Sequence, residues 1–124
     1  MLEIRQKNDI TGYAGYLWDY QLTADEIQIV EAFEKEKVIG FCIYSYTEDS
    51  VEIYHAKYGD NISLFDGIIR TVLFKAFLKG INKARYHFED MSLLYKLKLA
   101  DDYSNTLSSI ENVMNNCGNC KNSS

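Results

Sequence analysis

The fold is decided by residues 27–89, which read IQIVEAFEKEKVIGFCIYSYTEDSVEIYHAKYGDNISLFDGIIRTVLFKAFLKGINKARYHFE. Apolar, β-branched and aromatic residues dominate or alternate in short runs, which predicts strands, and one longer stretch repeats with the period of an amphipathic helix. The expected elements are strands over 27–34, 38–46, 51–58 and 84–88 and a helix over 64–79. Short charged turns join the first three strands, so these strands should form an antiparallel meander. The strand after the helix should run parallel to its neighbour.

Further elements flank this stretch. We expect a strand over 2–6, a helix over 11–20, a helix over 91–99 and a last helix over 107–116. The chain is therefore predicted to be one α/β (α+β) domain, residues 1–116, with a mixed, mainly antiparallel sheet flanked by helices. Residues 117–124 form a polar C-terminal tail that carries a Cys-x-x-Cys motif.

Composition narrows the classes of function. A chain of 124 residues with 47% apolar residues can form one globular domain. The net charge of −5, without a basic stripe, argues against a nucleic-acid partner and mildly favours a cationic amine. No apolar run approaches the roughly 20 residues that span a bilayer, so a membrane partner is not expected. The N-terminus lacks an apolar signal region, and we expect a cytoplasmic protein.

The turn into the main helix, residues 57–67, lies where an α/β fold usually holds its ligand, at a strand end and a helix N-terminus. Ser63 is the expected N-cap, and the N–H groups of residues 66–69 could receive an anion. The alternative is an ordinary connection, because the aspartates at 60 and 66 would repel a phosphate. Arg70 could contact a phosphate or pair with Asp66 one turn earlier.

Two segments carry a family resemblance. Residues 31–44, EAFEKEKVIGFCIY, form a hairpin whose charged turn leads into Val-Ile-Gly-Phe, and residues 93–99 read LLYKLKL. Together with the order of elements, they resemble the GCN5-related N-acetyltransferases over roughly residues 2–99. The resemblance implies that acetyl-CoA or another acyl-CoA is the cofactor and that the acceptor is a small-molecule or peptide amine.

The resemblance also implies site residues. The cofactor would lie along the turn and the start of the main helix, against Tyr58, Gly59, Gly67, Ile68, Ile69 and Arg70. Tyr95 takes the place of the family's tyrosine that protonates the leaving thiolate, although its position is shifted by one residue. Core packing is the alternative role for Tyr95.

The chain departs from the family pattern at the cofactor motif. One glycine of the motif remains at Gly67, Ile69 stands where a second small residue belongs, and Leu64 occupies the basic or amide position. The final two-strand hairpin of the family is missing, and residues 107–116 are predicted to be helical instead. A catalytically degenerate protein that binds a ligand or regulates a partner is therefore the alternative function.

Two further groups are candidates for acid–base chemistry. His55 lies on the third strand of the meander, on the face of Val51 and Ile53, and an imidazole titrates near neutral pH. Glu31 is a carboxylate among apolar residues of its strand and would be a base if buried. For each, a structural role on a polar strand face is the alternative, and His87 is interpreted as a polar-face residue.

The pair Cys117 and Cys120 suggests a thiol or metal function. One Cys-x-x-Cys supplies two ligands, whereas structural zinc takes four, so a single chain cannot complete a zinc site with this pair alone. A homodimer that contributes one pair from each chain could do so. Free thiols or a reducible disulfide in the tail are the other interpretations.

Overall fold

The computed structural model describes residues 2–7, 9–21 and 27–115. Within these ranges its elements are β1 (Leu2–Lys7), α1 (Gly15–Tyr20), β2 (Gln28–Glu34), β3 (Lys37–Tyr46), β4 (Val51–Lys57), α2 (Ile62–Leu78), β5 (Ala84–Tyr86), α3 (Ser92–Lys96), β6 (Thr106–Leu107) and α4 (Ile110–Asn115). The predicted meander, the long helix and the strand that follows it are all present. None of the helices described is long and apolar enough to cross a membrane.

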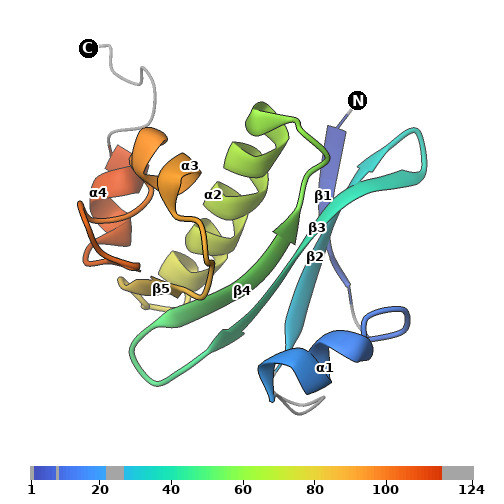
Figure 1. Ribbon diagram of the computed structural model, residues 1–124, viewed down its shortest axis with the longest axis horizontal. Coiled ribbons are helices and arrows are strands. Elements are labelled where there is room, and N and C mark those ends of the chain that lie inside the picture. Colours follow the sequence, from blue (N-terminus) through green and yellow to red (C-terminus); the bar gives the residue numbers. More distant parts are fainter. Residues whose placement is uncertain (1, 8, 22–26, 116–124) are drawn as a thin grey trace.

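The strands form one sheet in the order of the sequence (Figure 1). β1 to β4 pair antiparallel, β5 runs parallel to β4, and β6 pairs antiparallel with β5. The parallel step follows from α2, because a helical crossover returns the chain to the same end of the sheet. The predicted mixed, mainly antiparallel sheet is confirmed.

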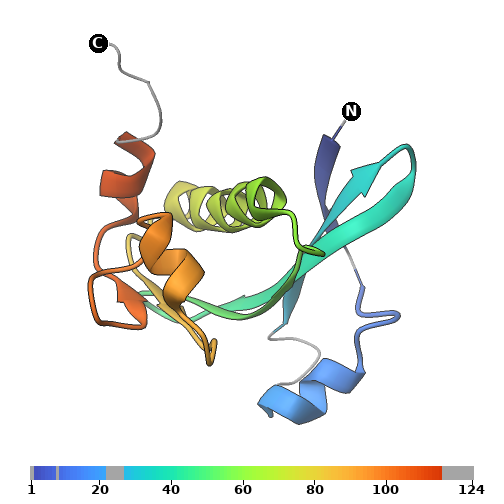
Figure 2. The same cartoon turned by 45° about the horizontal axis from the view of Figure 1, so that its top comes forward.

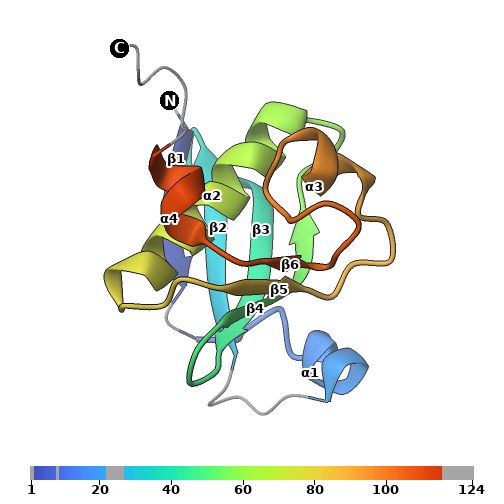
Figure 3. The same ribbon diagram turned by 90° about the vertical axis from the view of Figure 1, so that its left-hand side faces the viewer.

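The two faces of the sheet are covered unequally. α2 lies across one face and α1 lies against the other (Figure 2). α3 and α4 are on the same side of the sheet as α2 (Figure 3). The main core lies between α2 and the sheet and includes Val30, Cys42, Tyr44, Ile53, Ile68, Ile69, Val72, Leu73 and Tyr86. A smaller cluster of Ile27, Ile29, Phe41 and Ile43 faces the α1 side. β3 is therefore buried on both faces, as its continuous apolar run predicts.

Gly40 marks the closest approach of β3 to its neighbours. A Cβ at this position would lie 2.6 Å from the carbonyl oxygen of Lys57 and 3.1 Å from the Ile68 side chain. Backbone cannot give way as a flexible side chain does, so only glycine fits here. The glycine of the Val-Ile-Gly-Phe strand thus permits both the sheet and α2 to pack on β3.

Three details of the predicted elements are wrong. α1 begins at Gly15 rather than at residue 11, because the chain before it forms turns. α2 is capped by Asn61, whose Oδ1 accepts a hydrogen bond from the Leu64 N–H at 3.0 Å, and not by Ser63. Leu107 belongs to β6 and not to the last helix, which begins at Ile110.

A β-bulge in β4 changes the face of His55. Ile43 pairs with His55 and Tyr44 pairs with Ile53, so Tyr54 has no partner on β3. The extra residue shifts the alternation of side chains by one. Val51 and Ile53 consequently pack toward α2, whereas His55 stacks on Tyr16 next to α1. The predicted shared face of these three residues is wrong for this reason.

Candidate functional site

The most distinctive feature of the sheet is an opening between β4 and β5. The two strands pair over three residues, and the ladder ends where the N–H of His87 donates to the carbonyl oxygen of Ile53 at 2.9 Å. β4 continues to Lys57, whereas the chain after β5 turns toward α3 (Figure 1). The strands thus diverge, and within the described ranges no strand pairs with this edge of β4 beyond Ile53.

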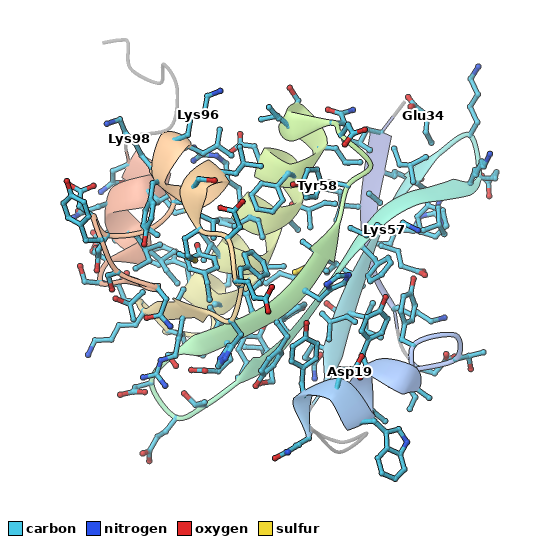
Figure 4. All side chains as sticks on the ribbon, viewed as in Figure 1. Asp19, Glu34, Lys57, Tyr58, Lys96 and Lys98 are labelled. Atoms are coloured by element: carbon cyan, nitrogen blue, oxygen red, sulfur yellow. The ribbon has the colours of Figure 1, made fainter. Side chains whose placement is uncertain are left out.

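A pocket of about 160 Å³ occupies the opening. Its aromatic wall consists of Tyr58, Phe65 and Phe88, with ring centroids 4.7 Å apart for the first pair and 6.3 Å for the second. Ala56, Leu93 and Leu94 add apolar surface, and His55, Asp90 and Ser92 contribute polar groups. Figure 4 shows Tyr58 at the end of β4, beside α2. Apolar side chains together with a few polar groups are typical of the lining of a small-molecule site.

The N-terminus of α2 lies at the same end of the opening, because the turn after Tyr58 leads directly into it. Asn61 satisfies the N–H of Leu64, and its own carbonyl oxygen accepts from Phe65. Of the first helical turn, the N–H groups of Ile62 and Ser63 have no partner among the described residues. These two donors and the positive end of the helix dipole face the turn.

The predicted anion-binding segment lies one turn further into the helix. Gly67, Ile68 and Ile69 are inside α2, where backbone N–H groups donate to the residue four positions earlier. Ile68 and Ile69 are fully buried in the core. Their N–H groups therefore donate within the helix, which weighs against this part of the prediction.

Arg70 forms the predicted intrahelical pair. Its Nε lies 2.8 Å from the Asp66 carboxylate, and both side chains are about one-third exposed, at 32%. The same arginine borders a second cavity of about 290 Å³ between α2 and the α3–α4 segment, together with Lys98 and Asp101. Figure 4 shows Lys98 on the side of α3 that is remote from Tyr58. The second cavity thus carries charges of both signs and is separate from the opening.

Two of the three predicted acid–base residues are engaged elsewhere. The Tyr95 hydroxyl donates to the carbonyl oxygen of Ser104 at 2.9 Å. The Glu31 carboxylate accepts from the Tyr13 hydroxyl at 2.6 Å, which ties the segment before α1 to β2. Neither residue lines the pocket at the opening. Both hydrogen bonds are structural contacts between elements.

His55 is the predicted acid–base residue that borders the pocket. Its ring stacks on Tyr16, with centroids 5.1 Å apart, and lies 5.7 Å from the Phe41 ring. Burial lowers the pKa of His55 below its ordinary value, and the charge of Asp19 offsets this only in part. Figure 4 places Asp19 on α1. The imidazole is therefore neutral near pH 7 and able to accept a proton.

A carboxylate–imidazole pair was missed by the sequence reasoning. Glu52 of β4 lies 2.7 Å from Nε2 of His87, the residue that follows β5. Glu52 is only 5% exposed although it is charged. The spacing of 35 residues gives no local signal for this contact. The contact follows from the register in which β4 and β5 pair. The sequence predicts that the two strands are parallel, but it does not predict their register.

The described cysteine, Cys42, does not line the pocket. Cys117 and Cys120 lie outside the described residues. Cys42 is fully buried in β3, and burial raises the pKa of its thiol. Within the described part of the chain, no group of three or more histidine, cysteine, aspartate or glutamate side chains is placed to hold a metal ion.

Known proteins resemble this chain in structure and not in sequence. No protein-family model and no curated protein sequence matches it. The ribosomal-protein-alanine N-acetyltransferase of Brucella melitensis biovar Abortus superposes with a TM-score of 0.60 at 14% identity, over 84% of this chain and 96% of that one. The IAA acetyltransferase of Bacillus cereus gives 0.62 at 13% identity, over 77% and 75%. A GNAT family acetyltransferase of Elizabethkingia anophelis, solved with acetyl-CoA bound, gives 0.60 at 13% identity, over 80% and 74%.

Proposed function

Since this chain has the fold of the GCN5-related N-acetyltransferases, we propose that it binds acetyl-CoA or another acyl-CoA and transfers the acyl group to a small-molecule or peptide amine. One observation carries the proposal. β4 and β5 pair over three residues and then part around a pocket of about 160 Å³. This opening lies beside a helix N-terminus, so one extended ligand could place an apolar arm between the strands and a phosphate at the helix.

The edge of β4 supports the placement of the arm. Beyond Ile53 the backbone groups on this edge have no strand partner in the described ranges. The pantetheine arm of coenzyme A is extended and carries amide groups, so it can add to a free edge as a short strand does. The acyl end would then meet the apolar wall of Phe65, Phe88 and Leu94.

The phosphate end fits less well. The N–H groups of Ile62 and Ser63 are suited to an anion, but the first-turn N–H of Leu64 is already capped by Asn61. Asp60 stands in the same turn, and the charge of Arg70 is shared with Asp66. This observation favours the second candidate function, a degenerate relative that binds a ligand or partner without catalysing transfer.

Calorimetry and thermal unfolding with ligand fragments test both candidates. Acetyl-CoA at about 100 times its Kd stabilises the native state by about 2.7 kcal/mol, which raises Tm by about 10 °C for a domain of this size. Acetyl-pantetheine probes the opening alone, and adenosine 3′,5′-bisphosphate probes the helix N-terminus alone. No shift with millimolar acetyl-CoA would contradict acyl-CoA binding. Binding without release of thiol in the presence of primary amines would favour the non-catalytic candidate.

A pair of variants ties the effect to the opening. Ala56→Phe places an aromatic ring in the pocket and is expected to weaken acetyl-CoA by at least tenfold while leaving the bisphosphate unchanged. Val38→Phe adds similar bulk on β3 at a position that is 41% exposed and does not line the pocket, and it serves as the control.

The thiol or metal alternative rests on Cys117 and Cys120. Alkylation of these two thiols, with and without zinc or reductant, tests it. Equal alkylation rates in every condition would contradict the alternative.

A further inference from the structure

Glu52 is a buried carboxylate whose partners fix its orientation. Its side chain lies on the α1 face of β4 and is 7% exposed. The Ser50 hydroxyl donates to Oε2 at 2.6 Å, and Nε2 of His87 lies 2.7 Å from Oε1. Ser50 is itself 2.9 Å from the Thr47 hydroxyl. Both carboxylate oxygens of Glu52 thus take part in hydrogen bonds. The chain of contacts from Thr47 through Ser50 and Glu52 ends at the His87 imidazole.

The environment keeps Glu52 ionised. Burial raises the pKa of its carboxyl, but the hydrogen bonds from Ser50 and His87 and the charge of Arg85 outweigh burial, so that the pKa lies below its ordinary value. An ionised carboxylate can only accept hydrogen bonds. In its neutral form, the His87 ring must therefore carry the hydrogen on Nε2, and Nδ1 keeps its lone pair.

The backbone of His87 lies at the rim of the opening, and its side chain stands beside the pocket without lining it. Its backbone N–H makes the last hydrogen bond between the diverging strands, to Ile53. Tyr86 points into the α2-side core, so by alternation the imidazole emerges on the opposite face. The side chain is 36% exposed, and within the described part of the chain no group hydrogen-bonds to Nδ1.

Aromatic rings support this position. The Tyr54 ring stacks on the imidazole with centroids 4.7 Å apart, and its hydroxyl is 2.9 Å from Ser45 Oγ. Tyr20 of α1 lies 5.2 Å from the Tyr54 ring. Arg85 and Glu89 are the charged residues two positions before and two positions after His87 in the chain. The ring of His87 thus has one face covered and one edge toward solvent.

We propose that His87, oriented by Glu52, accepts the proton that the acceptor amine loses during acyl transfer. This inference rests on the proposed function. The amine nitrogen forms a C–N bond to the acyl carbon, and the C–S bond of the thioester breaks with its electron pair going to sulfur. Nδ1 of His87 takes the proton from nitrogen, and the thiolate takes up a proton, so an amide and a thiol result. Glu52 stabilises the imidazolium that exists in between.

Two variants and a control test the proposal. His87→Gln removes the base but keeps a side chain that can bond to Glu52. Glu52→Gln keeps the imidazole and removes the charge that orients it. Glu89→Gln removes a nearby carboxylate that does not contact the ring. Each is compared with the wild type in melting temperature and in acetyl-CoA affinity. The kcat and kcat/KM for thiol release are measured with a panel of aliphatic and aromatic primary amines between pH 5.5 and 9.

The expected result is a specific pattern. Loss of a general base reduces kcat by roughly 100-fold or more. We expect this loss of kcat for His87→Gln near pH 7, with acetyl-CoA affinity unchanged. The loss should become smaller at high pH, where hydroxide can take the proton in place of the imidazole. Glu52→Gln should show a smaller loss, and Glu89→Gln none. The acceptor amine also changes its protonation over this pH range, and it does so equally for every variant. The ratio of wild-type kcat to variant kcat at each pH therefore cancels this effect.

A measurement without turnover gives the second readout. Long-range 1H–15N correlation spectra of the labelled protein report which ring nitrogen carries the hydrogen. We expect the Nε2–H form for His87, and the Nδ1–H form would overturn the proposal. A His87→Gln variant with wild-type kcat would also overturn it, even if Tm fell. A wild type that neither binds acetyl-CoA nor releases thiol would instead overturn the proposed function, and the dyad's role with it.

Discussion

The hydroxyl of Tyr95 donates a hydrogen bond to the carbonyl oxygen of Ser104 at 2.9 Å, which joins α3 to the loop before β6. A phenol has one hydrogen to donate. While it bonds to Ser104, Tyr95 cannot also protonate a leaving thiolate. The role that the family resemblance implies for Tyr95 therefore competes with a structural role that the contact supplies.

Replacement of Tyr95 by phenylalanine separates these roles. We expect Tyr95→Phe to lower the free energy of unfolding by about 1 kcal/mol, the usual net value of one hydrogen bond. The kcat for acyl transfer should stay within a few-fold of the wild type. Denaturant unfolding and thiol release measure the two quantities. Tyr103→Phe is the control, because Tyr103 is 99% exposed. A kcat loss of 100-fold at unchanged stability would restore Tyr95 as the acid.

Substitution by alanine is expected to have opposite effects on stability at Gly40 and at Gly67. Gly40→Ala brings a Cβ to 2.6 Å from the Lys57 carbonyl oxygen, so β3 and β4 must move apart. Such overpacking costs typically about 1–3 kcal/mol. At Gly67 a Cβ meets nothing within 4 Å, and the position is inside α2. Gly67→Ala should therefore stabilise the protein by roughly 0.5–1 kcal/mol.

The Gly67→Ala variant also tests the cofactor motif. Because the N–H of Gly67 lies one turn inside α2, we expect acetyl-CoA affinity to be unchanged. Weaker binding by tenfold, at increased stability, would show that the backbone at Gly67 approaches the cofactor after all.

Substitutions at Asn61 can separate the hydrogen bond that caps α2 from the effect of charge at the helix N-terminus. Asn61→Ala removes the bond to Leu64 and should cost about 1 kcal/mol of stability, whereas Ser63→Ala should cost little. Asn61→Asp keeps a good cap but adds a negative charge beside the N–H groups of Ile62 and Ser63. If a phosphate binds there, Asn61→Asp weakens acetyl-CoA without loss of stability. Equal affinity of Asn61→Asp and the wild type would place the phosphate elsewhere.

The parts of the fold that the sequence predicts are those with many repeats of one pattern. The strands from Gln28 to Lys57 and the long helix α2 each repeat their apolar period several times. β6 has two residues, Thr106 and Leu107, and no period can be read from two residues. The order of elements also predicted that a ligand would lie near the turn after Tyr58.

The candidate site depends on features that have no local signal. The bulge at Tyr54 moves His55 to the other face of β4. The contact between Glu52 and His87 depends on the register of two strands joined by a helix. The sequence predicts Ser63 as the N-cap of α2, whereas Asn61 caps the helix two residues earlier. In the first two cases strand pairing overrides the local pattern, whereas the cap of α2 is a local contact between residues three positions apart.

The lowered pKa of Glu52 predicts how the free energy of unfolding depends on pH. Its folded pKa is lower than its ordinary value, so its contribution to stability is full above the ordinary glutamate range and is lost as pH falls through the folded pKa. Glutamine resembles the protonated form. The difference in unfolding free energy between wild type and Glu52→Gln should therefore shrink as the pH falls through the folded pKa of Glu52.

The measurement is denaturant unfolding of both proteins at several pH values between neutral and pH 3. Ser50→Ala should reduce the part of the unfolding free energy that is lost in acid, since the Ser50 hydroxyl donates to the Glu52 carboxylate. A difference between wild type and Glu52→Gln that is independent of pH would contradict the lowered pKa.

Cys42 provides a probe of the core. It is fully buried in β3, and burial raises the pKa of its thiol, so both access and thiolate content oppose reaction. With Cys117 and Cys120 replaced by serine, we expect no modification by an aromatic disulfide reagent in the native state and one thiol per chain in denaturant. The residual native rate should follow the opening of β3 and rise in the destabilised Gly40→Ala variant. Rapid modification of the folded protein at the same rate in both backgrounds would contradict the packing of β3 between α2 and the α1-side cluster.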